Sequence, residues 1–111
     1  MLELTEEQVE RLRQREHADF VARLKTALVE KFPELAADDT LQPRLRVAHD
    51  WALRMGFESA EARTQLLFQE AFAPGFYEAP AIAAWLTKPG APIEQRWADL
   101  MALADARIQG R

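Results

Sequence analysis

Few side chains in this sequence could take part in covalent or metal chemistry. The 111 residues include two histidines, His17 and His49, one serine, Ser59, and no cysteine. A helical metal site often places two ligands one turn apart, and neither histidine has a histidine or carboxylate four residues away. Ser59 stands where a helix N-cap is expected, a position that favours serine for structural reasons. The sequence therefore predicts no metal site, no bound cofactor and no nucleophilic serine.

Carboxylate pairs are the remaining route to acid–base catalysis. Glu70 and Glu78 are close in sequence, and burial of such a pair would raise one pKa toward the range of a general acid. With 18 acidic residues in the chain, such pairs arise readily by chance. The four glycines are isolated, so there is no glycine-rich phosphate loop. We expect a protein that is not an enzyme; a deep polar pocket around Glu70 would favour a small enzyme instead.

Size and composition predict a single domain over residues 1–111. The apolar fraction of 49% and the charged fraction of 29% are those of an ordinary globular chain. Without cysteine, no disulfide framework can form. Residues 1–7 lack the basic and apolar segments of a signal peptide, and no apolar run approaches the ~20 residues of a membrane span. These features predict a cytoplasmic protein that does not bind membranes.

The charge of the chain argues against nucleic-acid binding. The net charge is −4, whereas phosphate neutralisation requires an excess of clustered lysine and arginine. Arg44, Arg46 and Arg54 form the only basic cluster, and acidic residues such as Asp38 and Asp39 stand near it. A DNA-recognition helix is therefore the less favoured interpretation. Such arginines pair with the neighbouring acids or steer a protein partner.

A long helix is expected over residues 6–31. Thr5 and Gln8 form a capping-box pattern at its start, because each side chain can bond the other residue's backbone amide. No glycine or proline interrupts the chain until Phe32-Pro33, where the residue before proline is pushed out of the helical region. At 1.5 Å per residue the helix is about 39 Å long, while a compact domain of this size has a radius of gyration of about 13 Å.

The N-terminal half of this helix has few apolar residues and is expected to project from the rest of the domain. One interpretation is a solvated face with ion pairs one turn apart, such as Glu7 with Arg11 and Arg15 with Asp19. The other is contact with a second copy of the chain, which would make a homodimer through the N-terminal helix. The sequence leaves both open.

Start and stop residues divide the rest of the chain into four further helices. The first of these opens at Asp39 or Thr40 and ends at Gly56, and its outer face would carry Arg44, Arg46, His49, Asp50 and Arg54. Its apolar stripe is Leu41, Leu45, Ala48, Ala52 and Met55. The others are expected over residues 60–72, from Pro80 to Leu86, and from Pro92 to Gly110. With no strictly alternating stretch, the sequence predicts an all-α fold, a compact bundle of four to five helices.

The segment from residue 64 to residue 87 is rich in aromatic residues and nearly free of charge. Its central turn, residues 74–80, begins and ends with proline and carries Phe76 and Tyr77, where a plain helical hairpin would be polar. Large rigid rings of this kind anchor protein interfaces. One interpretation makes these two rings an exposed binding patch together with Phe72. In the other, Phe76 closes the core while Tyr77 points outward.

The order of turns and aromatic residues along the chain carries a resemblance to a known group of proteins. It consists of Phe32-Pro33, Arg44, Arg46, the segment from Ala52 to Phe57, Ser59, Glu61, Phe68, the turn from Pro74 to Pro80, and Trp85-Leu86. Over about residues 15 to 100 this pattern resembles small all-helical bacterial proteins encoded beside spike, PAAR and effector genes of type VI secretion systems. The resemblance implies a cytoplasmic accessory role, as an effector chaperone or adaptor, or as an immunity protein that blocks a toxin.

Taken together, these features predict a non-catalytic protein-binding module. Its partner would be an effector or a toxin, with spike components as further candidates. The expected apolar anchors are Phe72, Phe76 and Tyr77, and the expected steering charges are Arg44, Arg46 and Arg54.

Overall fold

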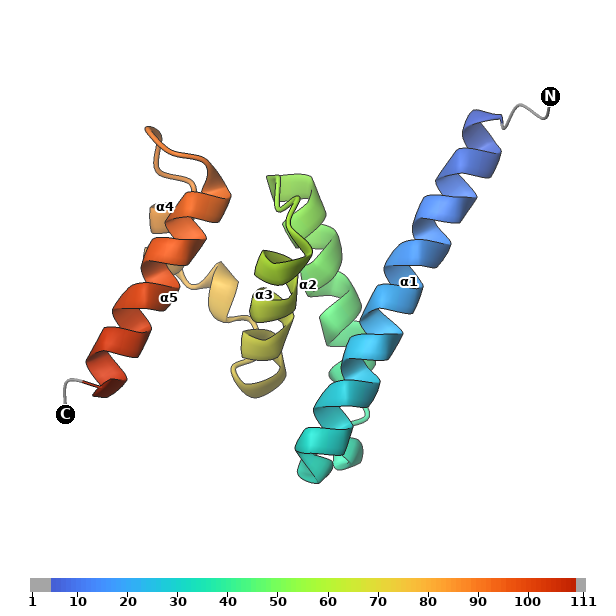
Figure 1. The fold of residues 1–111 in the computed structure, drawn as a ribbon, viewed down its shortest axis with the longest axis horizontal. Helices are drawn as coiled ribbons and strands as arrows, with labels where there is room; N and C mark the ends of the chain where they lie inside the picture. The colour runs from blue at the N-terminus through green and yellow to red at the C-terminus, as the bar shows by residue number, and fades with distance from the viewer. Residues whose placement is uncertain (1–4, 110–111) are drawn as a thin grey trace.

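Five α-helices joined by short connections make up residues 5–109, the part that the computed structural model describes, with side chains to residue 104. The α-helices are α1 (Glu6–Lys31), α2 (Leu41–Met55), α3 (Ala60–Phe72), α4 (Pro80–Leu86) and α5 (Ile93–Gln109), and the 3-10 helices are η1 (Pro33–Ala37) and η2 (Phe76–Glu78) (Figure 1). No strand occurs in this range, so the predicted all-α bundle with a long N-terminal helix is confirmed. None of the described helices has the length and apolar character needed to cross a bilayer.

The helix ends follow from local hydrogen bonds. At the start of α1, the amide of Gln8 donates to the Thr5 hydroxyl at 3.1 Å, and the amide of Thr5 donates to the Gln8 side chain at 2.8 Å. This is the predicted capping box. Ser59 caps α3 by accepting from the amide of Ala62, and Gly56 ends α2 with a positive φ of 100°. These ends match the sequence expectations because caps depend only on neighbouring residues.

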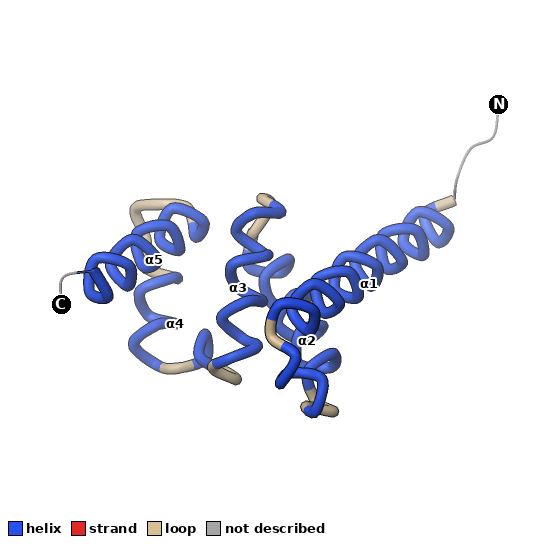
Figure 2. The backbone as a smooth tube through the Cα atoms, turned by 60° about the horizontal axis from the view of Figure 1, so that its bottom comes forward, coloured by secondary structure: helices blue, strands red, loops and turns tan. Residues whose placement is uncertain are grey.

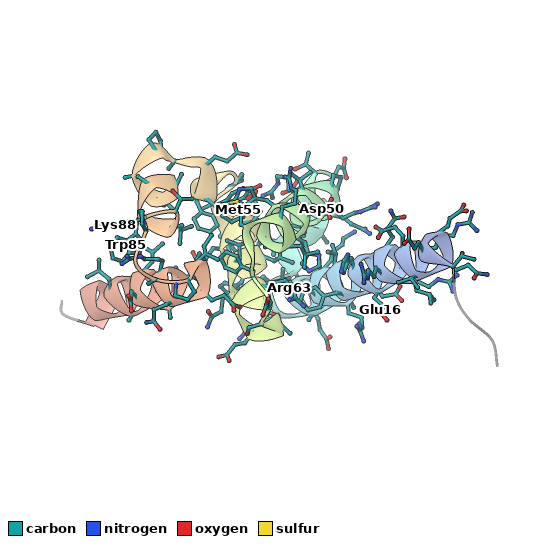
Figure 3. All side chains as sticks on the ribbon, turned by 90° about the horizontal axis from the view of Figure 1, so that it is seen from above. Glu16, Asp50, Met55, Arg63, Trp85 and Lys88 are labelled. Carbon is teal, nitrogen blue, oxygen red and sulfur yellow. The ribbon has the colours of Figure 1, made fainter. Side chains whose placement is uncertain are left out.

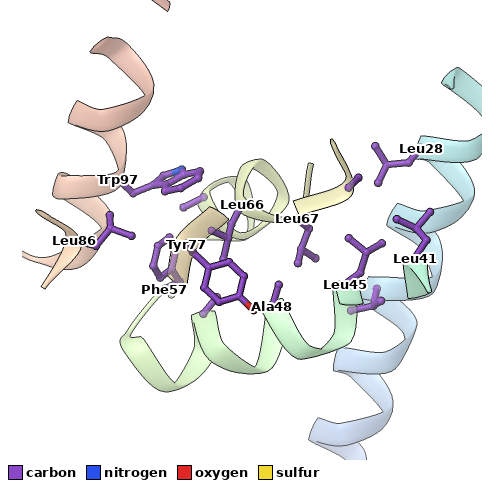
Figure 4. Packing of buried hydrophobic residues seen from close by; sticks show 14 of the residues in the cluster. Leu28, Leu41, Leu45, Ala48, Phe57, Leu66, Leu67, Tyr77, Leu86 and Trp97 are labelled. Atoms are coloured by element: carbon purple, nitrogen blue, oxygen red, sulfur yellow. The ribbon is translucent and has the colours of Figure 1, made fainter. Parts of the chain in front are cut away.

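The apolar core is one layer that runs from α1 across α2 and α3 to α5 (Figure 4). The α2 stripe lies at its centre, and Leu41, Leu45, Ala48 and Ala52 are fully buried, as predicted. From α1 the layer receives Val21 and Leu28, and at its other end it includes Trp97 of α5. The indole nitrogen of Trp97 donates to the Gln65 side chain at 2.9 Å, which satisfies its only polar atom.

The N-terminal part of α1 extends away from the other helices (Figures 1 and 2). Residues 6–16, here called the α1 arm, are exposed apart from Val9, which is half-buried. The predicted Glu7–Arg11 ion pair forms at 2.6 Å. Arg15 and Asp19 form no ion pair among the described residues. The radius of gyration is 15.9 Å, against about 13 Å for a compact chain of this length, because the arm lengthens the molecule.

Candidate binding surface

Three phenylalanines form an aromatic cluster where the end of α1 meets α3. Phe68 and Phe72 are one turn apart on α3, and their ring centroids are 5.3 Å apart. Phe32, the residue at which α1 ends, contacts both rings edge-on, with centroid distances of 5.9 Å to Phe68 and 5.0 Å to Phe72. These spacings are those of favourable aromatic pairs. We call Phe32, Phe68 and Phe72 the phenylalanine cluster.

This cluster presents apolar surface to solvent. Phe68 is 37% exposed and Phe72 is 46% exposed, while Phe32 is half-buried. The other large exposed apolar residues among those described, Leu12, Val47 and Leu103, come from separate helices. Scattered apolar residues are ordinary on protein surfaces, but contacting aromatic rings supply the concentrated apolar area of an interface centre.

A positive charge lies at the rim of the phenylalanine cluster. The Nζ atom of Lys31 is 5.8 Å from the centroid of the Phe32 ring. At this distance an ammonium group is attracted to the ring face, so the lysine stem can cover the ring while its charge stays in water. An apolar centre with a polar rim is the usual composition of a protein interface.

Arg44 ties together the segments that carry the phenylalanine cluster. Its Nη2 donates to Asp38 at 2.6 Å, just beyond η1, and its Nη1 donates to the backbone oxygen of Glu70 on α3 at 2.6 Å. A second contact joins Nη1 to the Glu70 carboxylate at 3.3 Å. Because η1 follows Phe32 directly and Glu70 lies between Phe68 and Phe72, these bonds fix the two sides of the cluster relative to one another.

Arg44 is therefore not the free steering charge that the sequence suggested, because its guanidinium is bonded within the fold. Its side chain is only 19% exposed, and both of its terminal nitrogens are bonded to acidic residues. Hydrogen bonds from Thr40, followed by those from Arg44, lower the pKa of Asp38 to about 2. Arg46 and Arg54 are exposed and have no ion-pair partner among the described residues. A steering role for these two arginines stays a prediction.

Glu70 holds the aromatic turn in place. Its side chain is 5% exposed, and both carboxylate oxygens accept from the amide of Gly75 at 3.0 Å. Gly75 has a positive φ of 74°, which suits a residue without a Cβ atom and reverses the chain at this point. Glu78 is exposed, so the two carboxylates considered for acid–base chemistry are not buried together.

The structure places Tyr77 inside the core, so the expectation that it points outward is wrong. Tyr77 is 3% exposed and its ring centroid is 4.6 Å from that of Trp51. Burial raises the pKa of its hydroxyl, with smaller contributions from Glu70 and Glu78. Phe76 is half-buried, 5.9 Å from Trp97 between ring centroids. The η2 turn folds back on the bundle, and therefore neither ring joins Phe72 in an exposed patch.

His49 is also buried, although the sequence places it on the outer face of α2. It is 1% exposed, its ring stacks on Phe20 at 4.8 Å, and it meets His17 edge-on at 5.4 Å. His49 follows the core residue Leu45 by four positions, so its spacing offered a signal for burial. Its contact with α1 could not be read from sequence spacing.

The sequence predicted Phe72 as a binding residue, but it did not predict that Phe32 and Phe68 belong to the same surface. The spacing of four between Phe68 and Phe72 places both rings on one helix face, which was a usable signal. Phe32 stands 36 and 40 residues before its two partners, and only the tertiary structure, in which α1 and α3 both pack on α2, brings the rings together.

Among the described residues, no three histidine, aspartate or glutamate side chains are close enough together to hold a metal ion. Comparison of the chain with protein-family models, with curated proteins and with solved structures gives no match.

Proposed function

We propose that this protein is a non-catalytic binding module that acts as an adaptor or chaperone for a type VI secretion effector. The observation that carries the binding role is the exposed phenylalanine cluster. The assignment to secretion effectors is supported by the sequence resemblance described above. In this proposal the apolar anchors are Phe68 and Phe72, supported by Phe32, while Arg46 and Arg54 steer the approach of the partner.

The exposed area of the cluster sets the size of its contribution to binding. Burying a whole phenylalanine side chain stabilises by about 1.5–3 kcal/mol. Because Phe68 and Phe72 are already more than half buried, each can add roughly 1 kcal/mol in a complex. The two rings together contribute about 2 kcal/mol, which corresponds to a change in Kd of roughly 30-fold. The partner surface should therefore be apolar and large enough to cover both rings.

The test measures the complex with each effector encoded beside the gene. The full chain is titrated calorimetrically with an intact effector and, separately, with its toxic domain alone. We expect the Phe68→Ala, Phe72→Ala double variant to bind roughly 30-fold more weakly, because it removes both exposed rings. The matched control is Leu103→Ala, since Leu103 is 60% exposed and lies on α5, outside the phenylalanine cluster.

The outcomes separate the proposed functions. Binding to the intact effector, lost in the double variant and kept by Leu103→Ala, supports the adaptor. Binding to the toxic domain alone, with rescue of cells that make this toxin, would show an immunity protein instead. If both variants bind as the native chain does, the phenylalanine cluster is not the partner surface. If no effector binds, the adaptor function is overturned. Circular dichroism of each variant shows whether its helices are intact.

A further inference from the structure

A second surface feature lies between the α1 arm and α2, far from the phenylalanine cluster. It is a cavity of about 380 Å³, open to solvent, where the two helices diverge (Figure 1). Its polar lining consists of Glu10, Gln14 and His17 from α1 and Arg46, His49 and Asp50 from α2. Figure 3 looks down on these diverging helices, with Asp50 labelled on α2 and Glu16 on α1.

His49 is the buried part of this lining, and its polar atoms have no hydrogen-bond partner among the described residues. The residue is 1% exposed, and neither Nδ1 nor Nε2 makes a hydrogen bond. Burial, the largest cause, lowers the pKa of His49 to about 4, so the ring is neutral at pH 7. A neutral imidazole has one donor and one acceptor nitrogen, and leaving a buried polar group unbonded costs about 1–3 kcal/mol. An external group that bonds this ring would recover part of that cost.

The charged side chains of the cavity also lack an ion-pair partner among the described residues. Within the described part of the chain, the side chains of Glu10, Arg46 and Asp50 form no ion pair within 4 Å. This differs from Arg44 on the same helix, which is bonded to two acidic residues. The charged groups of the lining are therefore available to a ligand, and His49 is the buried one of its six polar residues.

The charges of the lining favour a positively charged ligand. Among the lining residues, Glu10 and Asp50 contribute two negative charges against one positive charge from Arg46. Arg63, which is outside the lining, adds a positive charge near His49, whose ring is neutral and can accept a hydrogen bond. An anionic ligand would be repelled by the carboxylates of Glu10 and Asp50. A guanidinium group suits the site because its planar fork donates several hydrogen bonds at once, stacks on aromatic rings such as that of His17, and is weakly hydrated.

We propose that this cavity binds the guanidinium group of an arginine side chain on a partner protein. Glu10 and Asp50 bind the fork from the two helices, and the free nitrogen of His49 accepts from it at the base of the cavity. Arg46 acts against the ligand, because it brings a like charge to the same wall. Fewer than three potential metal ligands converge among the described residues, so a metal ion has no complete site in this cavity.

This proposal stands independently of the phenylalanine cluster. Phe32, just beyond the end of α1, follows His17 by fifteen positions, which at 1.5 Å per residue is roughly 20 Å along the helix. The two surfaces can therefore be inactivated one at a time. A partner that covers both surfaces would contact the phenylalanine cluster with apolar side chains and the cavity with an arginine.

The test uses N-acetyl-arginine amide as the probe and the full isotope-labelled chain at pH 7.5. We expect the imidazole signals of His17 and His49 to shift and to saturate at millimolar probe, because a single side chain provides few contacts. N-acetyl-glutamate amide, as the matched acidic probe, should leave these signals unchanged. The Phe68→Ala, Phe72→Ala double variant should bind the arginine probe as the native chain does.

Three single substitutions give effects of opposite sign. Asp50→Asn and Glu10→Gln each remove one attractive charge and should weaken binding about 5-fold, while Arg46→Gln removes the repulsive charge and should tighten it by a similar factor. All three residues are exposed, so the helical signal should stay unchanged. Weaker binding in the Arg46→Gln variant, a response to the glutamate probe, or shifts without saturation would each overturn the proposal.

Discussion

At the scale of single residues, His49 shows how a polar ring can be buried without hydrogen bonds. Its ring faces are occupied by Phe20, whose centroid is 4.8 Å away, and by the edge of His17. Arg63 lies on Phe20, 5.3 Å from the ring centroid, and adds a positive charge near the histidine. Burial comes first and the charge of Arg63 second among the causes that disfavour protonation. The fold therefore holds His49 in its neutral form.

The lowered pKa of His49 makes the stability of the fold depend on pH. The pKa is about 4 in the folded chain and 6.5 in the unfolded chain, so between these values the unfolded chain binds the extra proton. The contribution of neutral His49 to the free energy of unfolding is therefore fully present above pH 6.5, and it is lost as the pH falls toward 4. We expect a loss on the order of 2 kcal/mol between pH 7.5 and 4.5, measured by urea unfolding at each pH.

The control for this prediction is His49→Gln, which has no titrating group at this position. Its unfolding free energy should change much less over the same pH window. Asp38 does not interfere, because its pKa is lowered, so the stability it contributes is lost only as the pH falls from 3.8 toward 2. An equal loss in the native chain and in His49→Gln would show that other groups cause the acid sensitivity.

At the scale of elements, Arg44 sets how η1 and α3 sit on α2. Its guanidinium bonds to Asp38, six residues before it, and to Glu70, 26 residues after it in sequence. Glu70 in turn accepts from Gly75, so the same network reaches the aromatic turn. The connections around the phenylalanine cluster are thus held by one charged side chain and its partners.

Removing Arg44 should destabilise the fold because it leaves the buried Glu70 carboxylate without its cation. We expect Arg44→Ala to lower the free energy of unfolding by about 2–4 kcal/mol, measured by urea denaturation at pH 7.5. The matched control is Arg46→Ala, on the same helix but exposed and unpaired, which should change stability by less than about 0.5 kcal/mol. Equal effects of the two substitutions would contradict a structural role for the Arg44 network.

At the scale of the whole molecule, the chain exposes more surface than a compact protein of its mass. Its accessible surface is 7986 Å², whereas the usual scaling gives about 6,200 Å² for 12.7 kDa. The molecule measures 59 by 40 by 22 Å along its principal axes. The α1 arm accounts for part of this shape, since it lies outside the core layer (Figure 2).

Deleting residues 1–12 should therefore have little effect on the stability of the bundle. The described part of this segment contributes no buried residue, and we expect the free energy of unfolding to fall by less than about 1.5 kcal/mol, mostly through loss of the Thr5 cap. The same deletion removes Glu10 and should weaken binding of the arginine probe. Urea unfolding measures the first effect, and a loss above 3 kcal/mol would show that the arm packs on the core.

Sedimentation of the native and shortened chains addresses the homodimer that the sequence allows. The arm offers only Val9 and Leu12 as large apolar side chains, and Leu12 is 45% exposed. A change in mass from dimer to monomer on deletion would assign the dimer contact to this arm. An unchanged mass would exclude the arm as that contact.

The sequence by itself determined the helices and most of their ends. Capping by Thr5 and Ser59, the left-handed Gly56 and the break before Pro33 act within a few residues, so they can be read directly from neighbours in the chain. The apolar stripe of α2 also follows from spacing, because one face of a helix repeats every three to four residues. The sequence therefore sufficed for the all-α class and the long first helix.

Only the tertiary structure decided which side chains meet and which remain exposed. The contact of Phe32 with Phe72, the burial of His49 against α1 and the bonds of Arg44 to Glu70 each join residues from separate helices. Such contacts depend on how helices cross, and spacing along one helix carries no information about its neighbour. For the same reason the burial of Tyr77 and the cavity between α1 and α2 became visible only once the helices were placed in space.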